Sequence, residues 1–140
     1  IEKYFNRYLR VKEYFDDTIN FTREHGFVET ILKRRRYLKD INSKNYLLRS
    51  ANERAAINTP IQGSASDIIK LAMIDINNDK SLKDHSSLII QVHDELVFEC
   101  KKDKVDDVKR KIKKYMENCI KLKVPLEVDI DEGSSWSEAH

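Results

Sequence analysis

The sequence has few prolines and few cysteines, and it has no long hydrophobic run. Two prolines in 140 residues leave room for long helices, because proline breaks helix interiors. Cys100 and Cys119 make no disulfide framework and are too far apart for a CxxC-type zinc pair, so we expect free thiols in a reducing compartment. No stretch approaches the ~18 uncharged apolar residues of a membrane span, and the first residues lack a signal-peptide core, which leaves membrane insertion and secretion unsupported.

The chain instead has charge arranged in blocks. Its length suits one domain, and 40% hydrophobic residues fit a folded, soluble, helix-rich chain. The formal net charge is only +2, but basic residues outnumber acidic ones in residues 1–49 and 101–114, whereas residues 124–140 contain no lysine or arginine. Basic surfaces beside acidic residues suit a polyanion held against a metal centre. For residues 101–114 a solvated helix face is the preferred interpretation.

The most informative stretch is residues 87–100, SLIIQVHDELVFEC. Its two apolar runs predict the strands of a hairpin. The His-Asp-Glu triplet between the runs contains no Gly, Pro or Asn, the usual residues of a tight turn. This mismatch indicates function: Asp94 and Glu95 would stand at the apex, where a divalent cation such as Mg²⁺ can neutralise them. An ordinary solvated turn is the alternative.

The first part of the chain is predicted to be a helix followed by a hairpin. Residues 1–25 have apolar residues at three- and four-residue spacings, which predicts an amphipathic helix ending at Gly26. Its aromatic residues are expected to pack in the core rather than stack on bases. Residues 27–38 are expected to form a short hairpin leading into a loop, and their consecutive arginines can donate to phosphate. A solvated or salt-bridged arginine cluster is the alternative.

Two helical segments should follow. Residues 43–58 are predicted to form a helix capped by Asn42 or Ser43. Pro60 is expected to restart the helix, because proline is tolerated in a first turn and not in a helix interior. The second segment, residues 61–77, begins with Gly63 and other small residues that keep one face thin enough for close packing.

A polar row runs along these segments. Arg54, Asn58 and Gln62 fall at positions i, i+4 and i+8, which places three hydrogen-bonding side chains on one face if the joint at Pro60 does not rotate them apart. By spacing alone the row is an exposed polar stripe. Further along, residues 103–121 predict an amphipathic helix that covers the back of the hairpin, and the alternating residues 125–130 predict a strand.

Three stretches resemble one known family. The run QVHDELVFE (residues 91–99) resembles the third polymerase motif of the family A DNA polymerases, and RSANERAAINTPIQGSASD (residues 49–67) resembles the segment between the fingers and that motif. The ending GSSWSEAH also resembles the family's, and the matches follow its order and approximate spacing. The sequence departs at Lys33, where the family usually has Gly, and at Ser135, where it usually has Asn.

The resemblance covers essentially the whole chain and implies a fold and a reaction. The expected fold class is α+β, a helix-rich fragment with a small antiparallel sheet, in which residues 1–48 are the end of the fingers and residues 49–140 the C-terminal part of the palm. The implied reaction is template-directed DNA synthesis, in which a primer 3′-hydroxyl attacks the α-phosphate of a dNTP with the help of two Mg²⁺ ions. Asp94 is the implied catalytic metal ligand, and Glu95 is a nearby acid that reaches the metal through water.

The same resemblance assigns DNA contacts. Arg54, Asn58 and Gln62 would contact the minor groove and backbone near the primer end, where every correct pair presents an N3 or O2 acceptor at nearly the same place. Such a row tests pairing geometry without reading sequence. His93 would contact the primer-terminal nucleotide. The arginines of the predicted hairpin, which resemble a cluster in the family's fingers, would contact phosphate: Arg34, Arg35 and Arg36.

The resemblance also shows what the sequence lacks. A DYSQIE-like motif with the second metal-binding aspartate and the nucleotide-binding Lys and Tyr are absent, so we expect them to precede Ile1 in the same polypeptide. The chain alone should therefore be inactive, and its sheet should have an uncovered edge that favours self-association. The implied location is the nucleoid of a bacterial cytoplasm or, alternatively, a plastid-like organelle or mitochondrion.

Two functions from other classes remain as alternatives. One is a nucleic-acid-binding module without chemistry of its own, and it predicts that Asp94→Ala leaves catalysis intact. The other is a metal-dependent hydrolase, which would need further ligands at short spacing, and only Glu99 is near the triplet. An RNA polymerase of the single-subunit phage kind is a nearer relative of the DNA polymerases than either of these alternatives. The INTPIQG and QVHDELVFE runs nevertheless favour the DNA enzymes.

Overall fold

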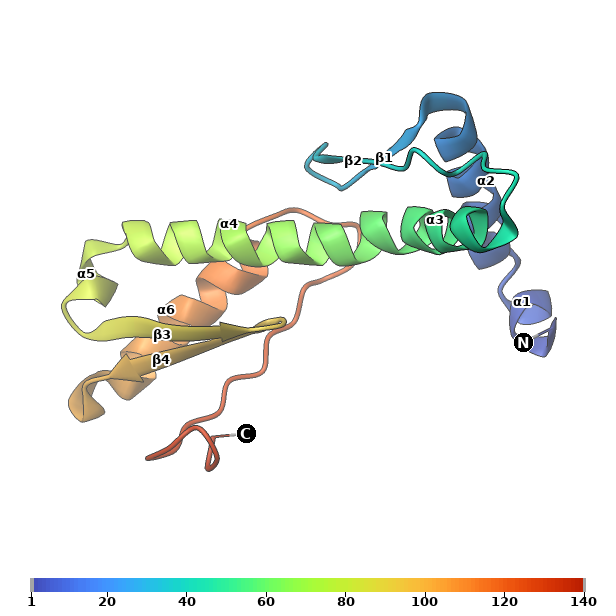
Figure 1. The fold of residues 1–140 in the computed structure, drawn as a ribbon. Coiled ribbons are helices and arrows are strands. Elements are labelled where there is room, and N and C mark those ends of the chain that lie inside the picture. The colour runs from blue at the N-terminus through green and yellow to red at the C-terminus, as the bar shows by residue number, and fades with distance from the viewer. Residues whose placement is uncertain (1, 140) are drawn as a thin grey trace. The chain divides into compact units, whose positions relative to one another are not determined.

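The computed structural model describes residues 2–139, so Ile1, which the predicted first helix included, and His140 lie outside the described residues. The chain divides into two compact units, Ile1–Asp67 and Ile68–His140. Helices predominate in both, and each unit has one two-stranded antiparallel sheet in its described part (Figure 1). The predicted α+β class with a small antiparallel sheet is therefore confirmed. No helix in the described part of the chain is both long and apolar enough to cross a membrane.

The first unit begins with helices and a hairpin. The predicted single helix is interrupted at Tyr8, whose backbone (φ −119°, ψ 64°) lies outside the helical region. The helix ends as predicted at Gly26, which takes up the left-handed conformation (φ 77°) and donates its N–H to the Thr22 carbonyl at 2.8 Å. The elements are, in order, α1 (Glu2–Arg7), α2 (Leu9–His25), β1 (Phe27–Glu29) and β2 (Arg35–Tyr37).

The predicted hairpin packs one face into the core of the first unit. Lys33, at the position where the resembled family has Gly, has φ of 65°, so a residue with a side chain occupies a left-handed position of the turn. The core cluster of this unit joins the hairpin to the helices that follow: Val28, Leu38, Ile41 and Ala56.

Helix α3 (Tyr46–Asn58) starts later than predicted, because Asn45 caps it by accepting from the Leu47 N–H at 3.0 Å. The predicted restart at Pro60 is also wrong, because the chain stays helical. A π turn, η1 (Thr59–Gly63), leads directly into α4 (Ser64–Asn78), which continues into the second unit. Proline has no N–H for the ordinary i→i−4 bond, and a π turn replaces that bonding pattern locally.

The second unit packs a long hairpin against a helix. Its remaining elements are α5 (Lys80–Lys83), β3 (Ser86–Val92), β4 (Glu95–Cys100), the 3₁₀ turn η2 (Lys102–Lys104) and α6 (Val105–Asn118). Leu96 and Phe98 of β4 pack on a cluster that contains Val108 and Ile112 of α6, so the predicted helix covers the hairpin as expected (Figure 1).

The predicted strand at residues 125–130 is wrong. These residues do alternate between exposed and half-buried positions, and Ile130 packs on the core of the second unit. They form no strand, however, and the Val128 N–H donates to a side chain, Glu117 Oε1, at 3.1 Å rather than to a neighbouring strand. Alternation indicates which face is buried, whereas a strand also needs a neighbouring backbone.

Candidate nucleic-acid interface and metal ligand

The β3–β4 hairpin has a two-residue turn, because β3 ends at Val92 and β4 begins at Glu95, its partner in register. The turn is His93-Asp94 rather than the whole triplet. His93 has φ of 52°, a left-handed conformation that a two-residue hairpin usually gives to Gly or Asn. Gln91 supports the turn by donating its Nε2–H to the His93 carbonyl at 3.2 Å. A histidine held in this backbone conformation is a local strain of the kind that occurs at functional sites.

Asp94 is exposed at the apex of this turn. Within residues 2–139 no hydrogen bond or ion pair holds its carboxylate, so both oxygens face solvent and can accept a ligand. A carboxylate is the ligand that Mg²⁺ prefers, so Asp94 fits one position in a magnesium site. The described residues contain no group of three His, Cys, Asp or Glu side chains that could hold a metal ion. Glu95 is also exposed, on the first position of β4.

Arg54, Asn58 and Gln62 are all exposed on the first unit. Arg54 Nη1 donates to Ser50 Oγ at 2.8 Å. In a regular α-helix, positions i and i+8 are ~80° apart around the axis, but the extra residue of the π turn places Gln62 near the i+7 position, only ~20° from Arg54. The joint at Pro60 therefore keeps the three side chains in one row. Ala56, on the opposite side of α3, is fully buried.

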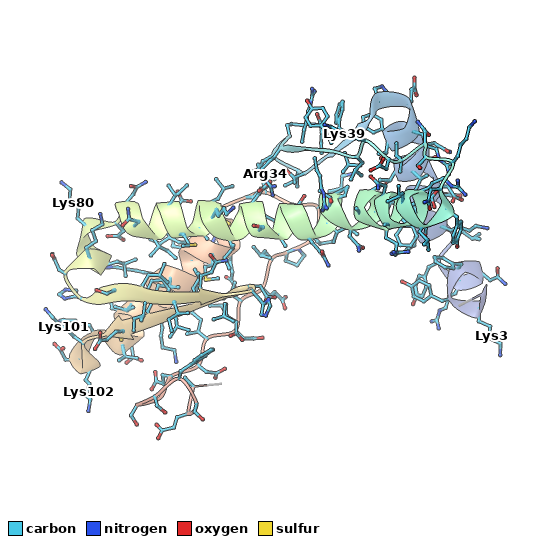
Figure 2. All side chains as sticks on the ribbon, viewed as in Figure 1. Lys3, Arg34, Lys39, Lys80, Lys101 and Lys102 are labelled. Atoms are coloured by element: carbon cyan, nitrogen blue, oxygen red, sulfur yellow. The ribbon has the colours of Figure 1, made fainter. Side chains whose placement is uncertain are left out.

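The three hairpin arginines are exposed, yet all of them make intramolecular contacts. Arg34, which is labelled in Figure 2, donates from Nε to Asp67 Oδ1 at 2.9 Å and from Nη2 to the Gly63 carbonyl at 3.1 Å. Arg36 Nη1 donates to Thr59 Oγ1 at 3.1 Å. Each guanidinium has five N–H donors, so these bonds leave others directed to solvent.

Arg35 differs from its neighbours because it pairs within the hairpin. Its Nε donates to Glu29 Oε1 at 2.8 Å, and this bond holds the pKa of Glu29 below its usual value. Lys33 Nζ lies 3.4 Å from the other Glu29 oxygen. The arginine cluster therefore anchors the hairpin while it presents positive charge at the surface.

Sequence reasoning missed how the hairpin is held to the helix. Asp67 is 7% exposed and bonds Arg34. A Cβ atom added at Gly63 would lie 2.8 Å from Thr30 Cγ2, and the Ile31 N–H donates to Ser64 Oγ at 2.8 Å. The predicted thin face is thus the face on which the hairpin packs. The four-residue interval between Gly63 and Asp67 could have indicated this packing, since it places both residues on the same face of the helix.

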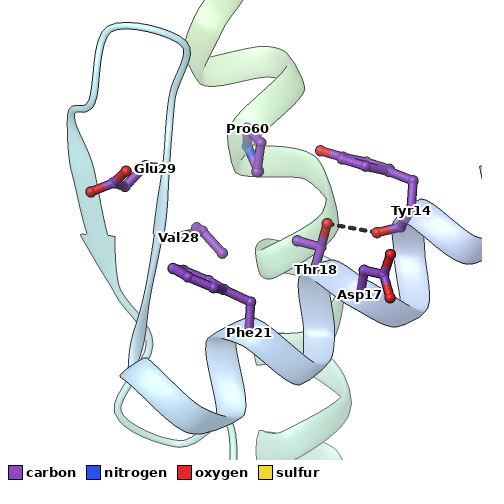
Figure 3. Close-up of a pocket in the computed structure, with 7 residues that line it drawn as sticks. All are labelled: Tyr14, Asp17, Thr18, Phe21, Val28, Glu29 and Pro60. Atoms are coloured by element: carbon purple, nitrogen blue, oxygen red, sulfur yellow. Dashed lines mark hydrogen bonds between the residues drawn. The ribbon is translucent and has the colours of Figure 1, made fainter.

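A groove of about 290 Å³ lies in the same unit between α2, β1 and the π turn (Figure 3). Its walls are mainly apolar, and its two charged residues, Asp17 and Glu29, are acidic. Its lining contains no lysine or arginine, so the groove itself offers no cation to a phosphate. Its lining residues are Tyr14, Asp17, Thr18, Phe21, Val28, Glu29 and Pro60.

The first unit presents an exposed polar row and a basic hairpin, and the second presents an exposed acid on a strained turn; each of these features suits a nucleic-acid-processing protein. The model of DNA polymerase family A matches residues 1–138. The chain is 52% identical over 99% of its length to DNA polymerase I of Caldicellulosiruptor bescii and 50% identical over 100% to that of Borreliella burgdorferi. It therefore belongs to DNA polymerase family A. It spans 16% of the length of each of these relatives.

A solved structure supports the same assignment. The POL domain of Pol1 from M. smegmatis, in complex with a DNA primer-template and dNTP, matches 99% of the chain with a TM-score of 0.93 and 43% identity. The chain covers 24% of that structure's chain. Family and fold are thus shown over nearly the whole chain.

Proposed function

We propose that this chain supplies part of the active site of a template-directed DNA polymerase, which transfers a dNTP to a primer 3′-hydroxyl and releases pyrophosphate. Membership of family A supports the reaction class. The observation that carries the proposal is the exposed Asp94 carboxylate, held at the apex of a turn whose other residue, His93, has a left-handed backbone.

Asp94 would act as a metal ligand. When bound, a pair of Mg²⁺ ions activates the attacking hydroxyl and offsets charge on the leaving oxygens. Asp94 holds one carboxylate at a fixed position for these ions because the paired strands β3 and β4 anchor the turn. Glu95, one residue further, acts as the acid that reaches the metal through water. The remaining ligands come from the rest of the polypeptide that carries this chain.

The row Arg54, Asn58 and Gln62 would read the geometry of the new base pair. Each side chain can donate to the N3 and O2 acceptors of the minor groove, which correct pairs present at nearly the same place. A mispair shifts these acceptors and breaks the bonds. His93 contacts the primer-terminal nucleotide in this proposal, next to the acid that holds the metal.

The hairpin arginines Arg34, Arg35 and Arg36 would contact DNA phosphates with the donors that their internal bonds leave over. In this scheme residues 1–48 belong to the fingers and residues 49–140 to the palm, and the protein works at a bacterial nucleoid or in an organelle. The complex of the M. smegmatis polymerase domain with primer-template and dNTP supports DNA and nucleotide as the partners.

Asp94→Asn in the complete polypeptide tests the proposal. We expect primer extension to fall by about a thousandfold or more, since loss of a metal ligand removes several kcal/mol of transition-state stabilisation. Single-turnover extension of a labelled primer measures the effect. Glu99→Gln, an exposed acid on β4, is the matched control and should retain activity. Unchanged extension by the Asp94 variant, with DNA binding intact, would favour the non-catalytic nucleic-acid-binding module instead.

A further inference from the structure

One face of the hairpin β1–β2 points away from the core of the first unit. Val28 points into the core and is 1% exposed. The residues on either side of Val28 in β1, and those on either side of its partner Arg36 in β2, point the other way, because side chains alternate along a strand. That outer face carries two cross-strand pairs, Phe27 with Tyr37 and Glu29 with Arg35.

Two rings at the end of α2 extend this outer face. Phe21 lies with its ring centre 5.7 Å from that of Phe27, and the His25 ring stacks on Phe21 at 4.2 Å with an angle of 16°. The Phe27 and Tyr37 rings are 5.8 Å apart. Tyr37 is 65% exposed and Phe21 is 42% exposed, whereas Phe27 between them is half-buried, so solvent reaches the row mainly at Tyr37 and Phe21. We call this row, with the arginine beside it, the aromatic surface: Phe21, His25, Phe27, Arg35 and Tyr37.

The charge of the aromatic surface fits a polyanion. The Arg35 guanidinium lies 4.2 Å from the centre of the Phe27 ring. It belongs to four consecutive basic residues, 33–36, whereas the acid on this face, Glu29, is already paired with Arg35 and Lys33. Rings that stack on bases beside cations that contact phosphates are the usual means of binding single-stranded nucleic acid. A duplex hides its base faces and would use only the cations.

We propose that the aromatic surface binds unpaired bases of single-stranded DNA by stacking, with Tyr37 as the outermost ring. The inference rests on the proposed function, in which the unpaired template strand is the single-stranded DNA at hand. It adds a contact outside the metal site and the minor-groove row. Cross-strand pairing stabilises the hairpin as well, but packing alone does not require the Tyr37 ring to remain 65% exposed.

Tyr37→Leu in the complete polypeptide tests this inference. The leucine keeps apolar contact with Phe27 but cannot stack on a base, so binding of a fluorescent oligodeoxythymidine should weaken by about tenfold to a hundredfold. Tyr37→Phe keeps the ring and should bind within about twofold of the wild type. Binding to a blunt duplex should be unchanged in both variants. Tyr4→Leu, an exposed tyrosine on α1, is the matched control and should have no effect on either DNA.

Crosslinking provides a readout that does not depend on affinity. A 5-iododeoxyuridine in the single strand should crosslink, on irradiation, to a residue of the aromatic surface, identified by mass spectrometry. The inference is overturned if the crosslinks map elsewhere, if Tyr37→Leu binds the single strand like the wild type, or if single strand and duplex lose affinity equally. Primer extension by the wild type is measured in parallel. A crosslink at the aromatic surface without extension would refute the polymerase proposal alone, and extension without the crosslink would refute this inference alone.

Discussion

At the scale of single residues, two aspartates show the difference between an acid that holds the fold together and an acid that is a candidate metal ligand. Asp67 is 7% exposed and bonds Arg34, so its charge is used to hold the hairpin to the helix. Asp94 is exposed on a strained turn, and no internal bond occupies it within residues 2–139. In the sequence both are acids within two residues of an apolar residue. Only burial and partners distinguish the structural acid from the candidate metal ligand.

Gln62→Ala should lower the ability of the polymerase to distinguish matched from mismatched primer ends. A lost minor-groove hydrogen bond costs about 1 kcal/mol, so extension of a matched primer should fall about fivefold. A mismatched end has already lost that bond and should be affected less. Steady-state kcat/KM for matched and mismatched primers measures the ratio. Asn77→Ala, an exposed amide outside the row, is the control. Equal losses on both primers would contradict the role of the row in testing base-pair geometry.

At the scale of elements, the end of α2 could be predicted from the sequence, whereas the hydrogen bonding around Pro60 could not. Gly26 ends α2 as expected, because its left-handed conformation is a strong local signal. The π turn at Pro60 was missed, because proline in a sequence indicates a break and does not show that a π turn can accommodate it within a continuing helix. The row of Arg54, Asn58 and Gln62 was predicted from spacing, and its alignment depends on that turn.

Gly63→Ala tests how closely the hairpin approaches the helix. The added Cβ would lie 2.8 Å from Thr30 Cγ2, and Thr30 is buried and β-branched, so it cannot easily move. We expect a net loss of about 1 kcal/mol in the free energy of unfolding, since overpacking exceeds the gain in helix propensity. Urea denaturation measures the change. Ala65→Ser, which adds one atom at an exposed position nearby, should cost less than about 0.5 kcal/mol. A stabilised Gly63→Ala protein would show that the hairpin does not pack tightly there.

At the scale of the whole molecule, the α+β class followed from periodicity and from the resemblance of a few motifs. The failure at residues 125–130 has a general cause: a strand depends on a partner strand, and the sequence of one segment does not show whether that partner exists. The same dependence applies to β3, which pairs only with β4 in the described chain although Leu88, Ile89 and Ile90 are substantially exposed. An apolar strand with an open edge favours pairing with further chain, and self-association of the isolated chain remains a prediction.

The 140-residue chain alone should not extend a primer. Its described residues contain no group of three metal-ligating side chains, and Asp94 by itself cannot hold the ions that activate the 3′-hydroxyl. Incubating the purified chain with Mg²⁺, primer-template and labelled dNTP should give no incorporation, whereas the complete polypeptide should extend the primer. A contaminating host polymerase is recognised by activity that persists in the Asp94→Asn chain. Incorporation by the wild-type chain that this substitution abolishes would show that the chain contains a complete active site.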